Sequence, residues 1–82
     1  SDVYKRQDLE RAERVAAVRK ALVRLSERDR QMLLMREEGF RYSEIADAVG
    51  VRPTSVGALV ARALKRFSAA YGAVGESYVA PE

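Results

Sequence analysis

Four basic side chains stand in a stretch of the chain that has no acidic residue between Asp47 and Glu76. They are Arg52, Arg62, Lys65 and Arg66. Clustered lysine and arginine side chains attract the phosphate groups of nucleic acids. The chain as a whole is only mildly basic, with a net charge of +3 over 82 residues. The local excess of positive charge therefore indicates a phosphate-binding face, and the alternative is a solvated basic helix.

The beginning of this stretch carries groups that suit contacts with the edges of DNA bases. Arg52 can donate to a guanine edge or to a phosphate, whereas Thr54 and Ser55 offer hydroxyl groups. Ala58 can contact only a thymine methyl group or allow a close approach. Gly57 costs about 1 kcal/mol in a helix relative to alanine, and it is tolerated best where another surface comes near. Without Asn or Gln on this face, we expect modest discrimination between sequences.

Further residues are expected to contact the DNA backbone, where the charged ones add affinity that falls steeply with salt. The expected phosphate contacts are Arg41, Tyr42, Ser43, Gly57, Arg62, Lys65 and Arg66. Tyr42 can alternatively serve as a hydrophobic staple at the start of a helix. Arg28 and Arg30 are weaker candidates. Each exposed arginine has an alternative role as a surface residue that keeps the domain soluble.

Two helices joined by a tight turn are expected to position these side chains. Ser43 can cap the first helix, Ile45 and Val49 recur at helical spacing, and Gly50 can end the helix in the left-handed conformation. Pro53 suits the first turn of the second helix. The apolar face of that helix comprises Val56, Leu59, Val60, Ala63, Leu64, Phe67 and Tyr71. This pattern is typical of a helix-turn-helix, whose second helix enters the major groove of DNA.

Two more helices are predicted upstream. Apolar residues three or four positions apart predict a helix over residues 8–25. Ser26 and Asp29 resemble a capping box, with Ser26 as the N-cap. They predict a second helix that runs to about Glu38 and stops at Gly39.

The chain is therefore predicted to be all-α, as a small four-helix domain over residues 8–71. Residues 1–7 and 72–82 lack a helical pattern, so we expect a disordered N-terminal segment and a flexible C-terminal tail. The apolar run from Met32 to Met35 spreads around more than one helix face. We expect the first helix to cover it, and the alternative is an exposed docking patch for a protein partner. Phe40 is expected to anchor the core.

Composition excludes several kinds of chemistry. The chain has no cysteine and no histidine, which rules out disulfides, thiolate zinc sites and histidine acid–base catalysis. No pair of nucleophile and base is suggested, so we expect no enzyme, no metal and no cofactor. No apolar run approaches the roughly 20 residues that span a bilayer. We expect a cytoplasmic protein that does not bind a membrane.

A series of short motifs runs from Ala21 to Tyr71. It comprises Leu25-Ser26-Glu27-Arg28, Met32-Leu33-Leu34-Met35, Gly39, Tyr42-Ser43-Glu44-Ile45-Ala46, Gly50, Ser55-Val56 and Ala61-Arg62-Ala63-Leu64. Taken in order, the series resembles region 4 of bacterial sigma factors of the sigma-70 family. The resemblance is closest to the extracytoplasmic-function (ECF) group. Two departures stand out, since Ser26 replaces the usual proline and Gly57-Ala58 replaces a common polar or basic pair.

The resemblance implies a helix-turn-helix fold of the winged-helix-like or sigma region 4 type, and recognition of the −35 promoter element in the major groove. By motif position, the residues that fall where the family's DNA contacts cluster are Arg52, Pro53, Thr54, Ser55, Gly57, Ala58 and Arg62. Of these, we expect base reading by Arg52, Pro53, Thr54, Ser55 and Ala58. The resemblance also implies docking on the flap of the RNA polymerase β subunit and, in many members, on an anti-sigma factor. The departure at Gly57-Ala58 weakens the expected base reading without affecting the fold.

Two other functions remain as alternatives. The output domain of a LuxR/GerE-type response regulator shares the Leu-Ser-x-Arg and Glu-Ile-Ala motifs. Tyr42 before Ser43, and the ending Ala61-Arg62-Ala63-Leu64, favour the sigma factor. A protein-interaction module with weak or no DNA reading is the alternative from another class. It is indicated by Gly57-Ala58 and by the apolar run from Met32 to Met35.

Overall fold

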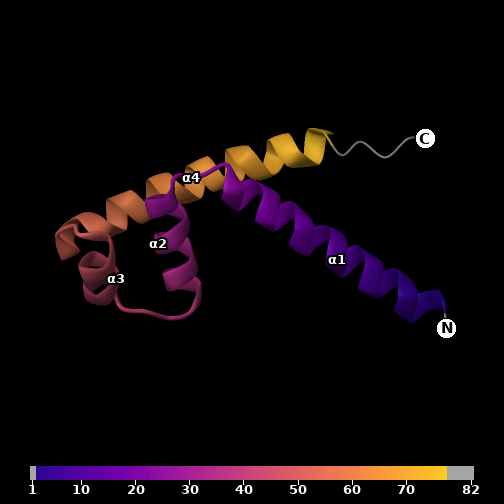
Figure 1. Cartoon of the computed structure of the whole chain (residues 1–82), viewed down its shortest axis with the longest axis horizontal. Helices are drawn as coiled ribbons and strands as arrows, with labels where there is room; N and C mark the ends of the chain where they lie inside the picture. The colour runs from indigo at the N-terminus through magenta and orange to yellow at the C-terminus, as the bar shows by residue number, and fades with distance from the viewer. Residues whose placement is uncertain (1, 78–82) are drawn as a thin grey trace.

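The computed structural model describes residues 2–77 and the side chains of residues 5–74. The described residues form four α-helices and no strand. The helices are α1 (Asp2–Val23), α2 (Glu27–Glu37), α3 (Tyr42–Val49) and α4 (Pro53–Ser77). Helices α2 and α3 pack against the first part of α4, and α1 contacts α4 and then diverges from it toward the N-terminus (Figure 1). The prediction of an all-α fold with four helices is confirmed.

Both terminal segments differ from the prediction. Helix α1 begins at Asp2, so the disorder expected over residues 1–7 is wrong for residues 2–7, and Ser1 lies outside the described residues. Lys5 and the two residues after it have high helix propensity, and extending an existing helix costs little. Helix α4 runs to Ser77, so the expected flexible tail is wrong up to that residue, and residues 78–82 lie outside the described part. Val74 is buried, and this contact supports the added turns of α4.

The core lies where α2, α3 and α4 meet. Its buried residues are Leu25, Met32, Leu33, Ile45, Ala46, Val56, Val60 and Ala63. Half-buried residues around it are Leu22, Met35, Val49, Val51, Leu59 and Phe67. The predicted apolar face of α4 is therefore confirmed along its centre, from Val56 through Ala63.

Three apolar residues lie farther from the core than predicted. Leu64 is 37% exposed and Tyr71 is 38% exposed, because both lie at one edge of the apolar face of α4. Phe40 is 41% exposed, so the prediction that it anchors the core is wrong. It follows the turn at Gly39, where φ is +88°, and its N–H group donates to the Met35 carbonyl at 3.1 Å. This turn closes α2 and directs Phe40 toward solvent.

Of the two predicted N-cap residues, Ser26 of α2 is confirmed and Ser43 of α3 is not. Ser26 caps α2 as predicted, since its Oγ accepts from the Asp29 N–H at 3.1 Å. The cap predicted at Ser43 is wrong, because Arg41 is the N-cap residue of α3 and Ser43 lies in the first turn. The Glu44 carboxylate accepts from the Arg41 N–H at 3.0 Å. A glutamate three residues after the cap satisfies a free N–H group there, so the helix starts earlier.

The apolar run in α2 divides between the core and the surface. Met32 and Leu33 are buried, whereas Leu34 is 46% exposed. Helix α1 covers the run only in part, because its main contact is with α4. Leu34 borders a hollow of about 290 Å³, which is lined by Val18, Leu22, Leu33, Leu34, Glu37, Leu64 and Phe67. Part of the run is therefore available to a partner.

Candidate nucleic-acid interface

Helix α3, the turn after it and the start of α4 form one rigid unit. Ile45 and Ala46 of α3 and Val56 of α4 belong to the same buried cluster. Gly50 ends α3 with φ +75°, in the left-handed region that favours glycine. The N–H groups of Gly50 and Val51 both donate to the Ala46 carbonyl, at 2.9 and 3.0 Å. This geometry fixes the direction of α4 relative to α3, as a helix-turn-helix requires.

The first turns of α4 present the residues that were predicted to read bases. Arg52, Pro53, Thr54 and Ala58 are exposed, and Ser55 is half-buried. Pro53 is the first helical residue, as predicted. The Ser55 N–H donates to the Arg52 carbonyl at 2.9 Å, so the turn that carries Arg52 is ordered against the helix. The structure thus brings the predicted base-reading residues together on one accessible end of α4.

Tyr42 and Gly57 face each other across the contact between α3 and α4. A Cβ atom built on Gly57 meets Tyr42 Cε2 at 3.8 Å, which is ordinary van der Waals contact. Tyr42 is nevertheless 45% exposed. Its ring therefore lies at the edge of the exposed face of α4, beside the predicted groove-reading residues. Arg41 and Ser43, its neighbours in sequence, are also exposed.

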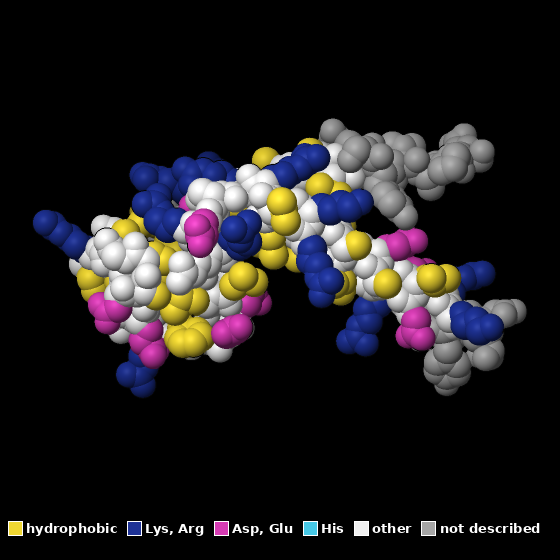
Figure 2. All heavy atoms as spheres, viewed as in Figure 1, with side chains coloured by type: hydrophobic (Ala, Val, Ile, Leu, Met, Phe, Trp, Pro, Cys, Tyr) yellow, Lys and Arg dark blue, Asp and Glu magenta, His cyan; other side chains and the backbone are white. Residues whose placement is uncertain are grey.

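Basic side chains border the same face. Figure 2 shows Lys and Arg side chains gathered along the edge formed by α4, with several acidic side chains on the opposite edge. Arg62 and Lys65 are exposed, and neither pairs with an acidic side chain among the described residues. Their charges are free to attract a phosphate backbone.

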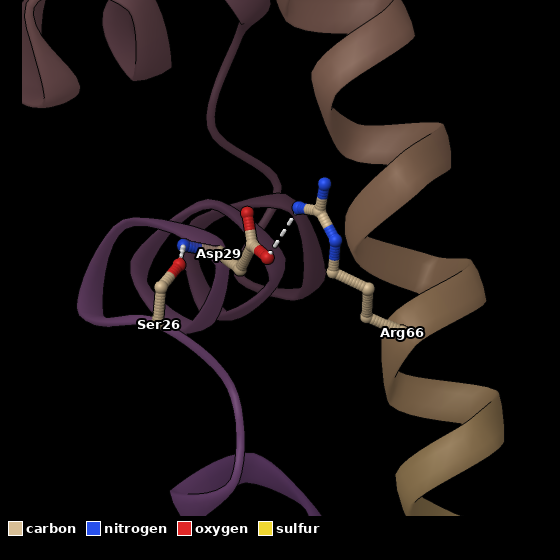
Figure 3. Close-up of polar contacts among 3 residues, drawn as sticks. All are labelled: Ser26, Asp29 and Arg66. Atoms are coloured by element: carbon tan, nitrogen blue, oxygen red, sulfur yellow. Dashed lines mark hydrogen bonds and ion pairs between the residues drawn. The ribbon is translucent and has the colours of Figure 1, made fainter.

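Arg66 differs from these two residues because it already has a partner. Its Nη1 donates to Oδ2 of Asp29 at 2.7 Å (Figure 3). Asp29 is 1% exposed, and its Oδ1 is buried without a hydrogen-bond partner among the described residues. The part of the predicted capping box that assigned the Asp29 side chain to the N-terminus of α2 is therefore wrong. The carboxylate bonds to α4 instead.

The sequence contains a signal that Asp29 is buried, although the motifs described above do not include it. Asp29 precedes Met32 by three residues and Leu33 by four, all within α2. Residues at this spacing share one face of a helix, and both neighbours are buried. An acidic residue on an apolar face requires a cationic partner, so the spacing could have predicted an ion pair.

The chain belongs to the sigma-70 region 4 family. The model of this family, described as "Sigma-70, region 4", matches residues 16–67, which are more than half of the chain. The family identifies the chain as a DNA-binding domain that acts in transcription initiation, and this favours a sigma factor over the response-regulator alternative. Neither the curated proteins nor the solved structures gave a match.

Other kinds of site find no support within the described part of the chain. No group of three or more acidic, cysteine or histidine side chains there could hold a metal ion. No helix formed by the described residues is long and apolar enough to cross a membrane.

Proposed function

We propose that this chain recognises the −35 promoter element through the first turns of α4, as a region 4 domain of the ECF group. The observation that carries the proposal is the exposed N-terminal end of α4, whose direction is fixed by the turn at Gly50. Arg52 directly precedes this helix, and Thr54 and Ala58 lie on it. Recognition helices read base edges with their N-terminal residues. Pro53 and Ser55 belong to the same proposed base-reading set.

Backbone contacts supply most of the affinity in this proposal. Arg62 and Lys65 bind phosphates on the flank of the groove, and Arg41, Tyr42 and Ser43 contact the backbone from the start of α3. Gly57 lets the DNA come close to α4. Because Gly57 and Ala58 offer no polar side chain, discrimination between related sequences is modest.

The binding proposal is tested by a salt titration with a labelled −35 duplex. The double variant Arg62→Ala/Lys65→Ala is expected to weaken binding to every duplex alike. The slope of log K against log salt should flatten by about 1.8, which corresponds to two phosphate contacts. Fluorescence anisotropy at several salt concentrations measures both quantities.

Two results would contradict this proposal. A wild-type chain without salt-dependent binding at low ionic strength would remove DNA binding itself. A loss confined to one base pair in the double variant would show that Arg62 and Lys65 read bases. Gln31→Ala, an exposed and uncharged position on α2, is the control and should bind as the wild type does.

We also propose that the apolar hollow beside Leu34 is the surface that docks on the β flap of RNA polymerase. Leu34 and Leu64 are partly exposed there, and the hollow lies between α1, α2 and α4 rather than at the first turns of α4. An exposed apolar hollow in a small domain favours a protein partner. An anti-sigma factor would compete for this surface where the cell provides one.

The docking proposal is tested with Leu34→Glu and an isolated β-flap fragment. The variant is expected to lose binding to the flap while it keeps binding to DNA, because the charge enters the apolar hollow. Isothermal titration calorimetry measures the affinity for the flap fragment, and fluorescence anisotropy measures the affinity for DNA. Equal flap affinity in both proteins would contradict the proposal.

A further inference from the structure

We propose that Asp29 is a positioning residue for DNA binding, whose buried carboxylate holds the Arg66 guanidinium ready to contact the phosphate backbone beside α4. The inference rests on the proposed function and deepens it. It assigns a role to a buried acidic side chain of α2 that lies away from the helix-turn-helix in the sequence.

The first support is the geometry of the pair. Asp29 lies in the first turn of α2 and Arg66 in the fourth turn of α4, and the bond between them is 2.7 Å long. The Asp29 side chain is 2% exposed, whereas that of Arg66 is 54% exposed. The anion is thus fixed inside the domain, and the cation extends from it toward solvent. Short, charge-assisted bonds of this kind restrict the motion of both groups.

The second support is the number of donors that remain on Arg66. A guanidinium has five N–H donors, and the bond to Asp29 is made through Nη1 alone. Figure 3 shows the other terminal nitrogen of Arg66 directed away from the carboxylate. Arg66 also follows Arg62 by one helical turn, so both cations lie on the same flank of α4. The remaining donors can therefore meet the backbone that Arg62 contacts.

The third support is that the Asp29–Arg66 ion pair contributes little to the stability of the folded domain. Asp29 Oδ1 is buried and lacks a hydrogen-bond partner among the described residues, which is costly in a core. Buried ion pairs with imperfect geometry add little net stability, and apolar replacements often serve as well. A held guanidinium, by contrast, loses less side-chain freedom when it binds DNA. The arrangement suits binding better than it suits folding.

The change in DNA affinity expected for a variant of Asp29 is opposite in sign to the change that net charge alone would cause. Asp29→Asn removes one negative charge, so electrostatics alone would strengthen binding to DNA. If Asp29 positions Arg66, the variant should instead bind a −35 duplex about threefold to tenfold more weakly. The matched control is Asp47→Asn, which makes the same chemical change on the exposed surface of α3. It should bind as tightly as the wild type, or more tightly.

A double-variant cycle separates positioning from a general effect on the fold. Arg66→Gln should flatten the salt slope by about 0.9, which corresponds to one phosphate contact. Adding Asp29→Asn to Arg66→Gln should change the affinity no further, because Asp29 acts through Arg66. Thermal melting shows that each protein is folded at the assay temperature. If Asp29→Asn does not fold, Asp29→Ala replaces it in the same cycle.

Three outcomes overturn the inference. The first is that Asp29→Asn binds DNA as tightly as Asp47→Asn does. The second is that the salt slope of Arg66→Gln equals that of the wild type. The third is that Asp29→Asn lowers the affinity of Arg66→Gln by as much as it lowers that of the wild type. Failure of the proposed function looks different, because the wild type itself would then show no salt-dependent binding. The two conclusions can therefore fail separately.

Discussion

Gly57 is a glycine within α4 that no contact among the described residues requires. It lies in a regular part of α4, outside the left-handed region, and a Cβ atom there would make only ordinary contact with Tyr42. Nothing in this contact requires glycine. A glycine inside a helix costs about 1 kcal/mol relative to alanine. The missing side chain is best explained by a surface outside the protein, which in the proposed function is DNA.

The prediction at this scale concerns Gly57→Ala. The free energy of unfolding should rise by about 0.5 to 1 kcal/mol, because alanine favours the helix and fits the available space. Binding to the −35 duplex should weaken, because the added methyl group meets the DNA. Chemical denaturation and anisotropy measure the two effects.

Gly72→Ala is the matched control, since Gly72 also lies within α4 and a Cβ atom there meets nothing within 4 Å. It should gain similar stability and leave DNA binding unchanged. If Gly57→Ala binds as tightly as Gly72→Ala, the close approach of DNA at Gly57 is wrong.

At the scale of the elements, apolar periodicity and turn residues predicted most helix faces and helix ends correctly. The apolar face of α4, the cap at Ser26 and the stops at Gly39 and Gly50 were all predicted correctly. Each of them depends on local chemistry within a few residues. The start of α3 was misplaced because the Glu44 carboxylate accepts from the Arg41 N–H group, which favours an earlier helix start.

The Asp29–Arg66 pair marks the limit of such local reasoning. The two residues lie 37 positions apart, so their contact depends on how α2 packs against α4. A helical period shows that a residue lies on the inner face, but it does not identify the element on the other side. For the same reason, the exposed residues at the N-terminal end of α4 could be predicted from the sequence, whereas the ion pair of Arg66 with Asp29 could not.

The prediction for the elements compares two apolar residues. Ile45→Ala should lower the free energy of unfolding by about 2 to 5 kcal/mol, because Ile45 is completely buried between α3 and its neighbours. Leu64→Ala should cost only about 1 kcal/mol, because 37% of Leu64 is exposed and less apolar area is lost. Urea denaturation measures both. Equal losses would mean that Leu64 is as well packed as Ile45.

The whole molecule is elongated, with a longest dimension of 49 Å. Its N-terminal arm, residues 5–16 of α1, is exposed throughout, and Leu9 in it is 64% exposed. The apolar spacing of this segment predicted a helix but not its separation from the core, because a helical period shows which residues share a face and does not show what covers that face. The family match begins at residue 16, where the arm ends.

The contact between Tyr42 and Gly57 has an optical consequence. The chain contains four tyrosines and no tryptophan, so its near-ultraviolet emission comes from tyrosine alone. The Tyr42 ring is half-exposed beside the position where a duplex would close over Gly57. In the proposed function, a duplex in contact with Gly57 covers this ring, and its emission is expected to change. The domain thus carries an intrinsic fluorophore at the proposed point of groove entry, which offers a way to follow binding without attaching a label.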